Sequence, residues 1–330
     1  MRTAEFVSPK HPDKMCDQIS DGILDYFLEG DENSRVAVET MGGHGKIYIA
    51  GEVTSKRDIV PIDIYKIISE VVEKDMNVEI NIVKQSQEIA QGVDIGGAGD
   101  QGIMKGYAVA ETMTLMPLEY ELARSLCWHI YEKFPNDGKT QITTGDNHEV
   151  IAIVASFQNA SKSDLKSIIK RWIVTQGIKV SSLCDIYTNP AGDWSIGGFD
   201  SDTGLTGRKL LIDNYGPRYA IGGGAFSGKD ATKVDRSAAY MARRIAVDLL
   251  NRNLDLGEVS VELAYAIGVA KPVEFSVTGE NGKKLESADS EFLKQYDLSP
   301  KGIIEYLGLR KPQFQETAEW GHFGKGFTWK

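Results

Sequence analysis

The stretch PDKMCDQISDGILDYFLEG, residues 12–30, with RVAVETM at 35–41 and KIYIAGEVT at 46–54, decides the fold of this chain. In the first segment apolar residues recur at helical spacing, Pro12 suits a first turn and Gly30 can end the helix, which predicts a helix over 12–29. The turn GGHG separates the two strand-like runs and favours a hairpin. The sequence therefore opens with a helix followed by a β-hairpin.

A helix that begins at Pro61 and a strand at 78–83 complete this first unit. The same order recurs with a helix at 117–134, strands at 139–143 and 149–157, and a helix at 162–175. A third pass has a helix at 230–251, strands at 260–267 and 272–278, and helical stretches near 286–294 and 299–307. Three passes predict an α+β protein of three similar domains, each a sheet with helices on one face. We place the domains at 1–94, 95–196 and 197–330.

The composition excludes several classes of protein. A chain of 330 residues with 42% hydrophobic residues is too long for one simple core. Its net charge of −10 argues against sequence-independent nucleic-acid binding, and no apolar run approaches the ~20 residues of a membrane helix. The N-terminus lacks the apolar stretch of a secretory signal. Cys16, Cys127 and Cys184 are scattered without CxxC spacing, which favours a reducing compartment, the cytoplasm by default.

Several cations gather in one part of this acidic chain: Arg208, Lys209, Lys229, Lys233 and Arg236. A locally basic pocket suits a small polyanion better than a long one. A solvated basic surface is an equally good interpretation of these residues alone.

Two glycine-rich motifs need their context. GAGDQG at 97–102 fits the dinucleotide fingerprint, but a strand-like segment follows it where that fingerprint requires a helix. Residues 223–229 nearly complete a Walker A loop, but Asp230 stands where a Ser or Thr should bind magnesium. Glycine amides, a following helix and Lys229 still favour a loop that cradles phosphate over a plain flexible turn.

At this point the chain resembles the methionine adenosyltransferase (S-adenosylmethionine synthetase) family. The likeness rests on GAGDQGIMKGY (97–107), GGGAFSGKD (222–230), HPDKMCDQISDGILD (11–25), TGLTGRK (203–209), KVDRSAAYMARRIA (233–246) and TAEWGHFGK (317–325), in the family order. The resemblance implies three α+β domains related by a pseudo-threefold axis. It also implies a homodimer, often paired into tetramers, with active sites between the chains. The implied substrates are ATP and L-methionine, and the implied cofactors are Mg²⁺, two per site, and K⁺.

The implied reaction is attack of the methionine sulfur on C5′ of ATP, which expels the triphosphate for hydrolysis to pyrophosphate and phosphate. A thioether has no proton to lose, so no catalytic base is required. The step needs in-line positioning and stabilisation of charge on the leaving oxygen.

The resemblance also assigns residues to roles. The catalytic set is His11, Arg208, Lys229, Lys233 and Asp235. The ATP-binding set is His11, Asp137, Lys139, Trp194, Asp202, Arg208, Lys209, Ala225 and Lys229. The methionine-binding set is Glu52, Gln91, Asp100, Asp202 and Lys233. Asp13 and Asp235 would bind magnesium and Glu39 potassium. The alternatives are a helix-entry histidine, a first-turn carboxylate at Asp13 favoured by the helix dipole, and an outward-facing strand glutamate.

The chain departs from the family in four places. Asp193 stands where the family has an arginine, which puts one phosphate or base contact in doubt. Pro9 and Lys10 precede His11 in place of Glu-Gly, and 156–159 differs from the family sequence. The loop at 92–96 is shorter than the family's mobile lid. The rival hypotheses are a P-loop-like NTPase and a non-catalytic nucleotide-binding regulatory subunit.

Overall fold

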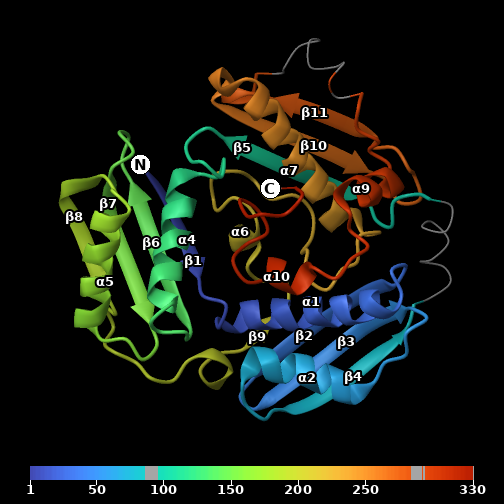
Figure 1. Ribbon diagram of the computed structural model, residues 1–330, viewed down its shortest axis with the longest axis horizontal. Helices are drawn as coiled ribbons and strands as arrows, with labels where there is room; N and C mark the ends of the chain where they lie inside the picture. Colours follow the sequence, from blue (N-terminus) through green and yellow to red (C-terminus); the bar gives the residue numbers. More distant parts are fainter. Residues whose placement is uncertain (86–95, 284–291, 293, 330) are drawn as a thin grey trace.

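The computed structural model describes residues 1–85, 96–283, 292 and 294–329 (Figure 1). Three open sheets surround the C-terminal segment, and each sheet carries its helices on one face, as Figure 1 shows. The α+β class and the three-domain plan predicted from the sequence are confirmed. No helix in the described part of the chain is long and apolar enough to span a membrane.

The first sheet has the strand order β4-β3-β2-β9. Its strands are β4 (Asn77–Lys84), β3 (Lys46–Thr54), β2 (Arg35–Gly43) and the short β9 (Gly204–Leu205), with the helices α1 (Pro12–Gly30) and α2 (Pro61–Val72). The β2–β3 hairpin is antiparallel, as GGHG indicates, and β3 pairs with β4 in parallel. The sheet is therefore mixed.

The second sheet has the order β1-β6-β7-β8. Its strands are β1 (Arg2–Val7), β6 (Gly138–Thr144), β7 (Val150–Phe157) and β8 (Val180–Thr188), with the helices α4 (Leu118–Tyr131) and α5 (Lys162–Thr175). A capping box begins α5: Ser161 accepts the Asp164 N–H, and the Asp164 carboxylate accepts the Ser161 N–H. The bounds predicted for this helix are therefore the observed ones.

The third sheet has the order β11-β10-β5, and its three described strands are antiparallel. They are β11 (Glu274–Thr278), β10 (Glu258–Tyr265) and β5 (Gly102–Val109), with the helices α7 (Val234–Arg252) and α9 (Pro300–Leu307). Short helices complete the described chain: α6 (Leu210–Asp213), α10 (Phe314–Thr317), and 3₁₀ turns at Gly198–Asp200, Leu254–Leu256 and Glu280–Gly282. Most of the helical stretch predicted near 286–294 lies outside the described residues.

The sheets exchange strands along the chain. β1 begins the chain but joins the second sheet, through six residue pairs with β6. β5 precedes α4 in sequence but joins the third sheet beside β10. No sheet is therefore built from one contiguous segment. The domain boundaries at 94 and 196 stay a prediction, and strands of the sheets cross these boundaries.

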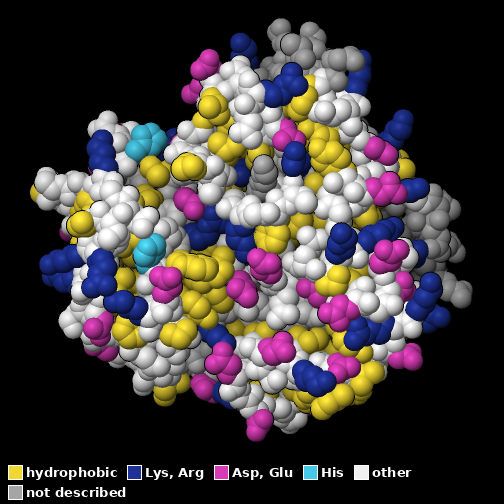
Figure 2. Space-filling view, viewed as in Figure 1, with side chains coloured by type: hydrophobic (Ala, Val, Ile, Leu, Met, Phe, Trp, Pro, Cys, Tyr) yellow, Lys and Arg dark blue, Asp and Glu magenta, His cyan; other side chains and the backbone are white. Residues whose placement is uncertain are grey.

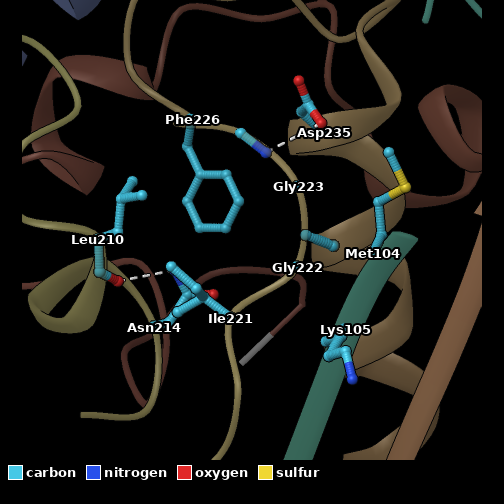
Figure 3. A pocket seen from close by; sticks show the side chains of 11 residues that line it. Met104, Lys105, Leu210, Asn214, Ile221, Gly222, Gly223, Phe226 and Asp235 are labelled. Carbon is cyan, nitrogen blue, oxygen red and sulfur yellow. Dashed lines mark hydrogen bonds between the residues drawn. The ribbon is translucent and has the colours of Figure 1, made fainter. Parts of the chain in front are cut away.

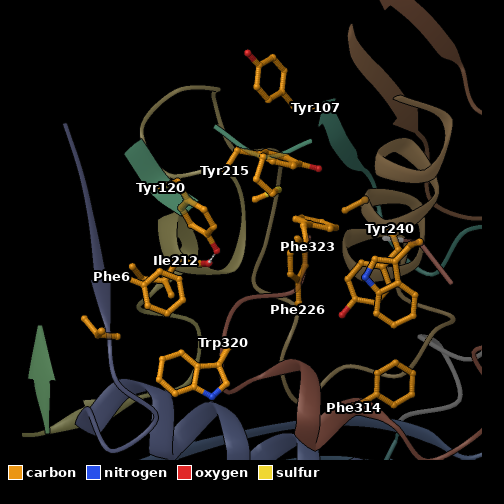
Figure 4. Close-up of a cluster of buried hydrophobic side chains, with 14 of the residues drawn as sticks. Phe6, Tyr107, Tyr120, Ile212, Tyr215, Phe226, Tyr240, Phe314, Trp320 and Phe323 are labelled. Atoms are coloured by element: carbon orange, nitrogen blue, oxygen red, sulfur yellow. Dashed lines mark hydrogen bonds between the residues drawn. The ribbon is translucent and has the colours of Figure 1, made fainter. Parts of the chain in front are cut away.

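An aromatic cluster fills the centre where the three sheets' helices meet (Figure 4). Tyr240 of α7 stacks on Trp329 with ring centroids 4.1 Å apart, and Phe226 and Phe323 pack edge-on against the Tyr240 ring. Trp320 stacks on Phe6 of β1. Burial of such rings is a large apolar contribution to stability. The C-terminal segment is thus part of the core that fixes the three domains to one another.

Candidate active site

The start of α1 places the first two site residues. His11 is the N-cap: its backbone is extended, and its Nδ1 accepts the Asp13 N–H at 3.2 Å. Because Nδ1 is an acceptor, Nε2 carries the proton of the neutral ring. Burial first, then the charges of Lys209 and Lys139, lowers the pKa of His11 to about 3. His11 is therefore a neutral hydrogen-bond donor at physiological pH.

Asp13 lies at the centre of a cluster of cations. Lys209 Nζ lies 2.6 Å from Asp13 Oδ2, Arg208 Nε lies 3.4 Å from Oδ1, and the Leu205 amide donates to Oδ1 at 2.9 Å. Burial alone would raise the pKa of Asp13, but the Lys209 and Leu205 hydrogen bonds hold it below its ordinary value. The buried carboxylate is therefore ionised, and it draws two cations beside His11.

Residues of the second sheet border this cluster. The Asp137 carboxylate accepts the Gly198 N–H at 3.0 Å, and burial raises the pKa of Asp137. Lys139 is close enough to both His11 and Asp137 to shift their pKa values. A cavity of about 140 Å³ opens beside Asp137, with Gly197, Gly198 and Phe199 among its walls. His11, Asp13, Asp137, Lys139, Arg208 and Lys209 therefore form one group, here called the histidine group.

Trp194 and Asp202 lie near this cavity. Trp194 is half-buried, and its ring lies beside Gly197, where an added Cβ would come within 2.8 Å of Trp194 Cζ3. The exposed Asp202 accepts the Thr203 N–H and is close enough to affect the pKa of Asp137. Asp193 accepts N–H bonds from Lys162 and Asn189, so this departure from the family serves the start of α5.

The glycine-rich loop and the first turn of α7 carry a second group, Lys229, Lys233 and Asp235, here called the lysine group. Figure 3 shows the loop at Gly222 and Gly223 with Asp235 beside it. Lys229 Nζ lies 2.7 Å from Asp235 Oδ2, and the Gly224 amide donates to Asp235 Oδ1 at 3.2 Å. A Cβ added at Gly224 would lie 2.6 Å from Asp235 Oδ2, so the loop can enclose this carboxylate only because it is glycine. The Gly224 amide thus binds a carboxylate of the same chain.

Lys233 does not contact the Lys229–Asp235 pair but has its own carboxylate partner. It is the N-cap of α7 and forms an ion pair with the buried Asp230. Asp230 also accepts the N–H groups of Val36 and Thr232, and these bonds stabilise a turn before the helix. The helix α7 therefore begins at Val234, four residues after the predicted start. The carboxylate at the Walker Ser/Thr position is therefore used for folding.

The remaining predicted residues lie on strands and loops. Glu39 of β2 is exposed and Glu52 of β3 is half-buried. Asp100 is exposed and accepts the Gln101 N–H, in a loop followed by β5, which excludes the helix of a dinucleotide fingerprint. Ala225 lies beside Gly207, where an added Cβ would be 2.5 Å from its own. Gln91 and most of the 92–96 loop lie outside the described residues.

The two groups are not joined by side-chain contacts within one chain. Across the described ranges, no hydrogen bond or ion pair connects the side chains of His11, Asp13, Arg208 or Lys209 with those of Lys229, Lys233 or Asp235. The same part of the structure holds no cluster of three or more His, Cys, Asp or Glu side chains that could bind a metal. Asp13 and Asp235 are thus separate carboxylates, each beside a lysine.

One set of residues was missed by the sequence reasoning. Asp17, Asp21 and Asp25 recur every four residues along α1 and accept backbone N–H groups from Gly207, Gly228 and Phe314. Asp17 accepts from Gly207, which precedes Arg208, and Asp21 accepts from Gly228, which precedes Lys229, each at 2.8 Å. The signal was the D-x-x-x-D-x-x-x-D spacing in a helix with few exposed positions. These carboxylates position both groups of cations.

Family models match nearly the whole chain in three parts. The models described as S-adenosylmethionine synthetase N-terminal, central and C-terminal domain match residues 1–91, 95–194 and 196–330. The chain is similar to an S-adenosylmethionine synthase of Mycoplasmopsis synoviae (strain 53), with 41% identity over 365 aligned residues that cover 99% of this chain and 94% of the relative.

A second relative has the same description. An S-adenosylmethionine synthase of Brachyspira hyodysenteriae (strain ATCC 49526 / WA1) is 39% identical over 377 aligned residues, which cover 99% of this chain and 95% of the relative. Both alignments are longer than the 330 residues of this chain, so both relatives have residues at positions that this chain lacks.

Proposed function

The chain belongs to the S-adenosylmethionine synthetase family, and from this premise we propose that it joins L-methionine to ATP and releases S-adenosylmethionine, pyrophosphate and phosphate. The observation that carries the proposal is the histidine group, in which a neutral histidine and several cations gather around one buried carboxylate. A polyanionic substrate matches this arrangement. A thioether nucleophile has no proton to lose, so the step needs no base.

The residues of the histidine group would stabilise the leaving triphosphate. In the proposed step a lone pair of the methionine sulfur forms the bond to C5′ while the C5′–O bond breaks, and its electrons pass to the triphosphate oxygen. The uncharged His11 ring would donate a hydrogen bond from Nε2–H to that oxygen. Arg208 and Lys209 would supply positive charge to the same oxygen and its neighbours. Lys139 adds a further charge beside them.

Asp13 and Asp235 fit a hard divalent cation. Each is a buried carboxylate whose partner is a lysine ammonium, at 2.6 and 2.7 Å, so each already interacts with a positive charge. Mg²⁺ prefers one or two carboxylates together with substrate phosphates, and we propose these two residues for two magnesium ions and the exposed Glu39 for K⁺. When bound, these ions would neutralise charge on the triphosphate.

The remaining predicted residues would recognise the substrates. Asp137, Trp194 and Asp202 border or approach the cavity beside Gly197, and Ala225 lies beside Gly207; we propose that these residues contact the nucleoside. Glu52, Asp100, Asp202 and Lys233, with Gln91 from outside the described residues, would bind the methionine ammonium and carboxylate groups.

A homodimer would bring the two groups together. Exposed apolar side chains occur on strands of all three sheets: Met41 (β2), Val83 (β4), Ile103 (β5), Leu183 and Tyr187 (β8), and Leu205 (β9). Exposed apolar surface of this extent favours a protein partner, and a second copy would cover it. We propose a dimer, with pairing to a tetramer left to measurement, and the cytoplasm as its compartment, consistent with three free cysteines.

The test is an assay with ATP, L-methionine, Mg²⁺ and K⁺. We expect S-adenosylmethionine and pyrophosphate in equal amounts. ADP as the phosphorus product would instead support the P-loop-like NTPase or kinase alternative. No turnover, with ATP still bound, would support a regulatory subunit.

A further inference from the structure

A cleft separate from both site groups lies between α4 and the C-terminal segment. Its volume is about 490 Å³, and its walls are Glu121, Arg124, Ser125, Trp128, Glu316, Glu319, Trp320, Gly324 and Lys325. Figure 2 shows a hollow in this region, with basic and hydrophobic side chains in it and acidic ones at its rim. None of these residues belongs to the sets assigned to ATP, methionine or metals. The volume suits a small organic ligand.

Most polar groups of the cleft are already satisfied by the protein. Arg124 donates to the carbonyl groups of Phe323 and Gly324 and to the Glu121 carboxylate. Glu121 also accepts from Thr114. These two charges therefore hold the C-terminal loop against α4.

Glu319 and Lys325 are the partly exposed charges that remain on the cleft wall, beside the exposed Glu316. Both are only partly exposed, and within the described residues they form no ion pair with each other. Lys325 donates to the Glu316 carbonyl oxygen, and no hydrogen bond to the Glu319 carboxylate is formed in the described part of the chain. Burial raises the pKa of Glu319 and lowers the pKa of Lys325 to about 8. An acid and a base that face one cleft without a direct ion pair, each close enough to shift the pKa of the other, match a ligand with both charges.

Two indoles supply the apolar wall. The Trp128 and Trp320 ring centroids are 4.8 Å apart at an interplanar angle of 54°, so the rings form an angled surface. Trp320 is buried against Phe6, whereas 46% of Trp128 is exposed. Indole faces bind apolar, planar and cationic groups.

We propose that this cleft binds an α-amino acid as its zwitterion, with the ammonium on Glu319, the carboxylate on Lys325 and the side chain against Trp128 and Trp320. One carbon carries both charged groups of an α-amino acid, so a single small ligand can reach an acid and a base that do not reach each other. L-Methionine, other apolar amino acids and S-adenosylmethionine share this chemistry.

The experiment measures binding to the full-length protein. Equilibrium dialysis with labelled L-methionine should give two molecules per chain, and titration should quench a tryptophan signal that Trp128→Phe removes. N-acetylmethionine and methioninamide, which each lack one charge, should leave the signal unchanged. Parallel titrations with L-phenylalanine and S-adenosylmethionine identify which side chain the cleft prefers.

Glu319→Gln and Lys325→Met should each weaken the quenching titration by about tenfold or more, since each removes a bond to a charged group. Lys325→Arg should restore binding. The matched control is Glu316→Gln, which removes the exposed carboxylate of the same rim and should change affinity by less than about threefold.

The outcomes separate this site from the catalytic one. Loss of the second methionine in Glu319→Gln with unchanged thermal unfolding and unchanged kcat supports the proposal. The proposal is overturned if none of L-methionine, L-phenylalanine and S-adenosylmethionine gives a Trp128 titration that Glu319→Gln weakens, or if Glu316→Gln shows an equal loss. A chain that makes no S-adenosylmethionine but still shows the Trp128 titration would contradict the proposed function and leave the cleft in place.

Discussion

The Asp21 carboxylate of α1 and the Arg236 guanidinium of α7 form a two-bond ion pair, with N–O distances of 2.6 and 2.9 Å and both side chains fully buried. Asp21 also accepts the Gly228 N–H, so one carboxylate joins α1, α7 and the glycine-rich loop. Removal of one partner of a buried pair leaves the other charge uncompensated. The pair therefore connects the stability of the fold to the position of Lys229.

We expect Asp21→Asn to lower the free energy of unfolding by about 3–5 kcal/mol, because it leaves the Arg236 charge buried without its partner. Urea denaturation measures the change. The control is Asp63→Asn, whose partner Lys66 is exposed, with an expected loss below about 0.5 kcal/mol. Equal losses in the two variants would show that burial of the Asp21 pair has no special role.

Local patterns in the sequence predict most elements of the fold. The bounds of α5 follow from its capping box, and the β2–β3 hairpin from GGHG. The pairing of β1 with β6 joins residues more than 130 positions apart, and no local pattern specifies which sheet an isolated strand enters. Domain membership of β1 and β5 therefore depends on tertiary contacts that the sequence order hides.

The sequence names the candidate site residues, but it does not predict how these residues group in space. His11 as an N-cap and the glycine-rich loop are local features of the sequence. The separation of Asp13 from Asp235 depends on the packing of α1 against the C-terminal half of the chain. Lys233 illustrates the limit, because its ion pair with Asp230 is decided by a turn that delays α7.

We expect Lys229→Ala and Asp235→Asn each to reduce kcat by about a hundredfold, because each removes a charged contact at the reacting centre. Thermal unfolding of Lys229→Ala should be unchanged, since Lys229 is partly exposed. Steady-state rates of S-adenosylmethionine release give the measurement. Lys66→Ala, an exposed lysine of α2, is the control and should keep full activity. A loss below about threefold in either site variant would contradict the assignment.

The buried His11 should make the protein less stable in acid. Its pKa of about 3 in the folded state lies below the ordinary value near 6.5, so the unfolded chain binds the proton first as pH falls. Titration of His11 therefore leaves the free energy of unfolding unchanged above about pH 6.5. Between pH 6.5 and pH 3 it lowers the free energy of unfolding by up to about 1.4 kcal/mol per pH unit. Urea denaturation of wild type and His11→Asn, which keeps an N-cap acceptor, should diverge across this window. A constant difference between pH 7 and 4 would contradict a neutral His11.

Mixing two inactive variants tests whether the histidine and lysine groups of different chains complete one site. Asp13→Asn disables the first group and Lys229→Ala the second, and each variant alone should retain about one per cent of wild-type activity or less. In a mixed dimer with shared sites, one site carries both changes and the other carries neither. Random assembly makes half of the dimers mixed, so co-expressed chains should reach about a quarter of wild-type activity.

The matched control is Asp13→Asn with Lys209→Met, two changes in the same group, which leave every site of every dimer defective. If each chain forms its own site, neither mixture regains activity. Activity in the first mixture and none in the second would therefore place Asp13 and Lys229 of different chains in one active site.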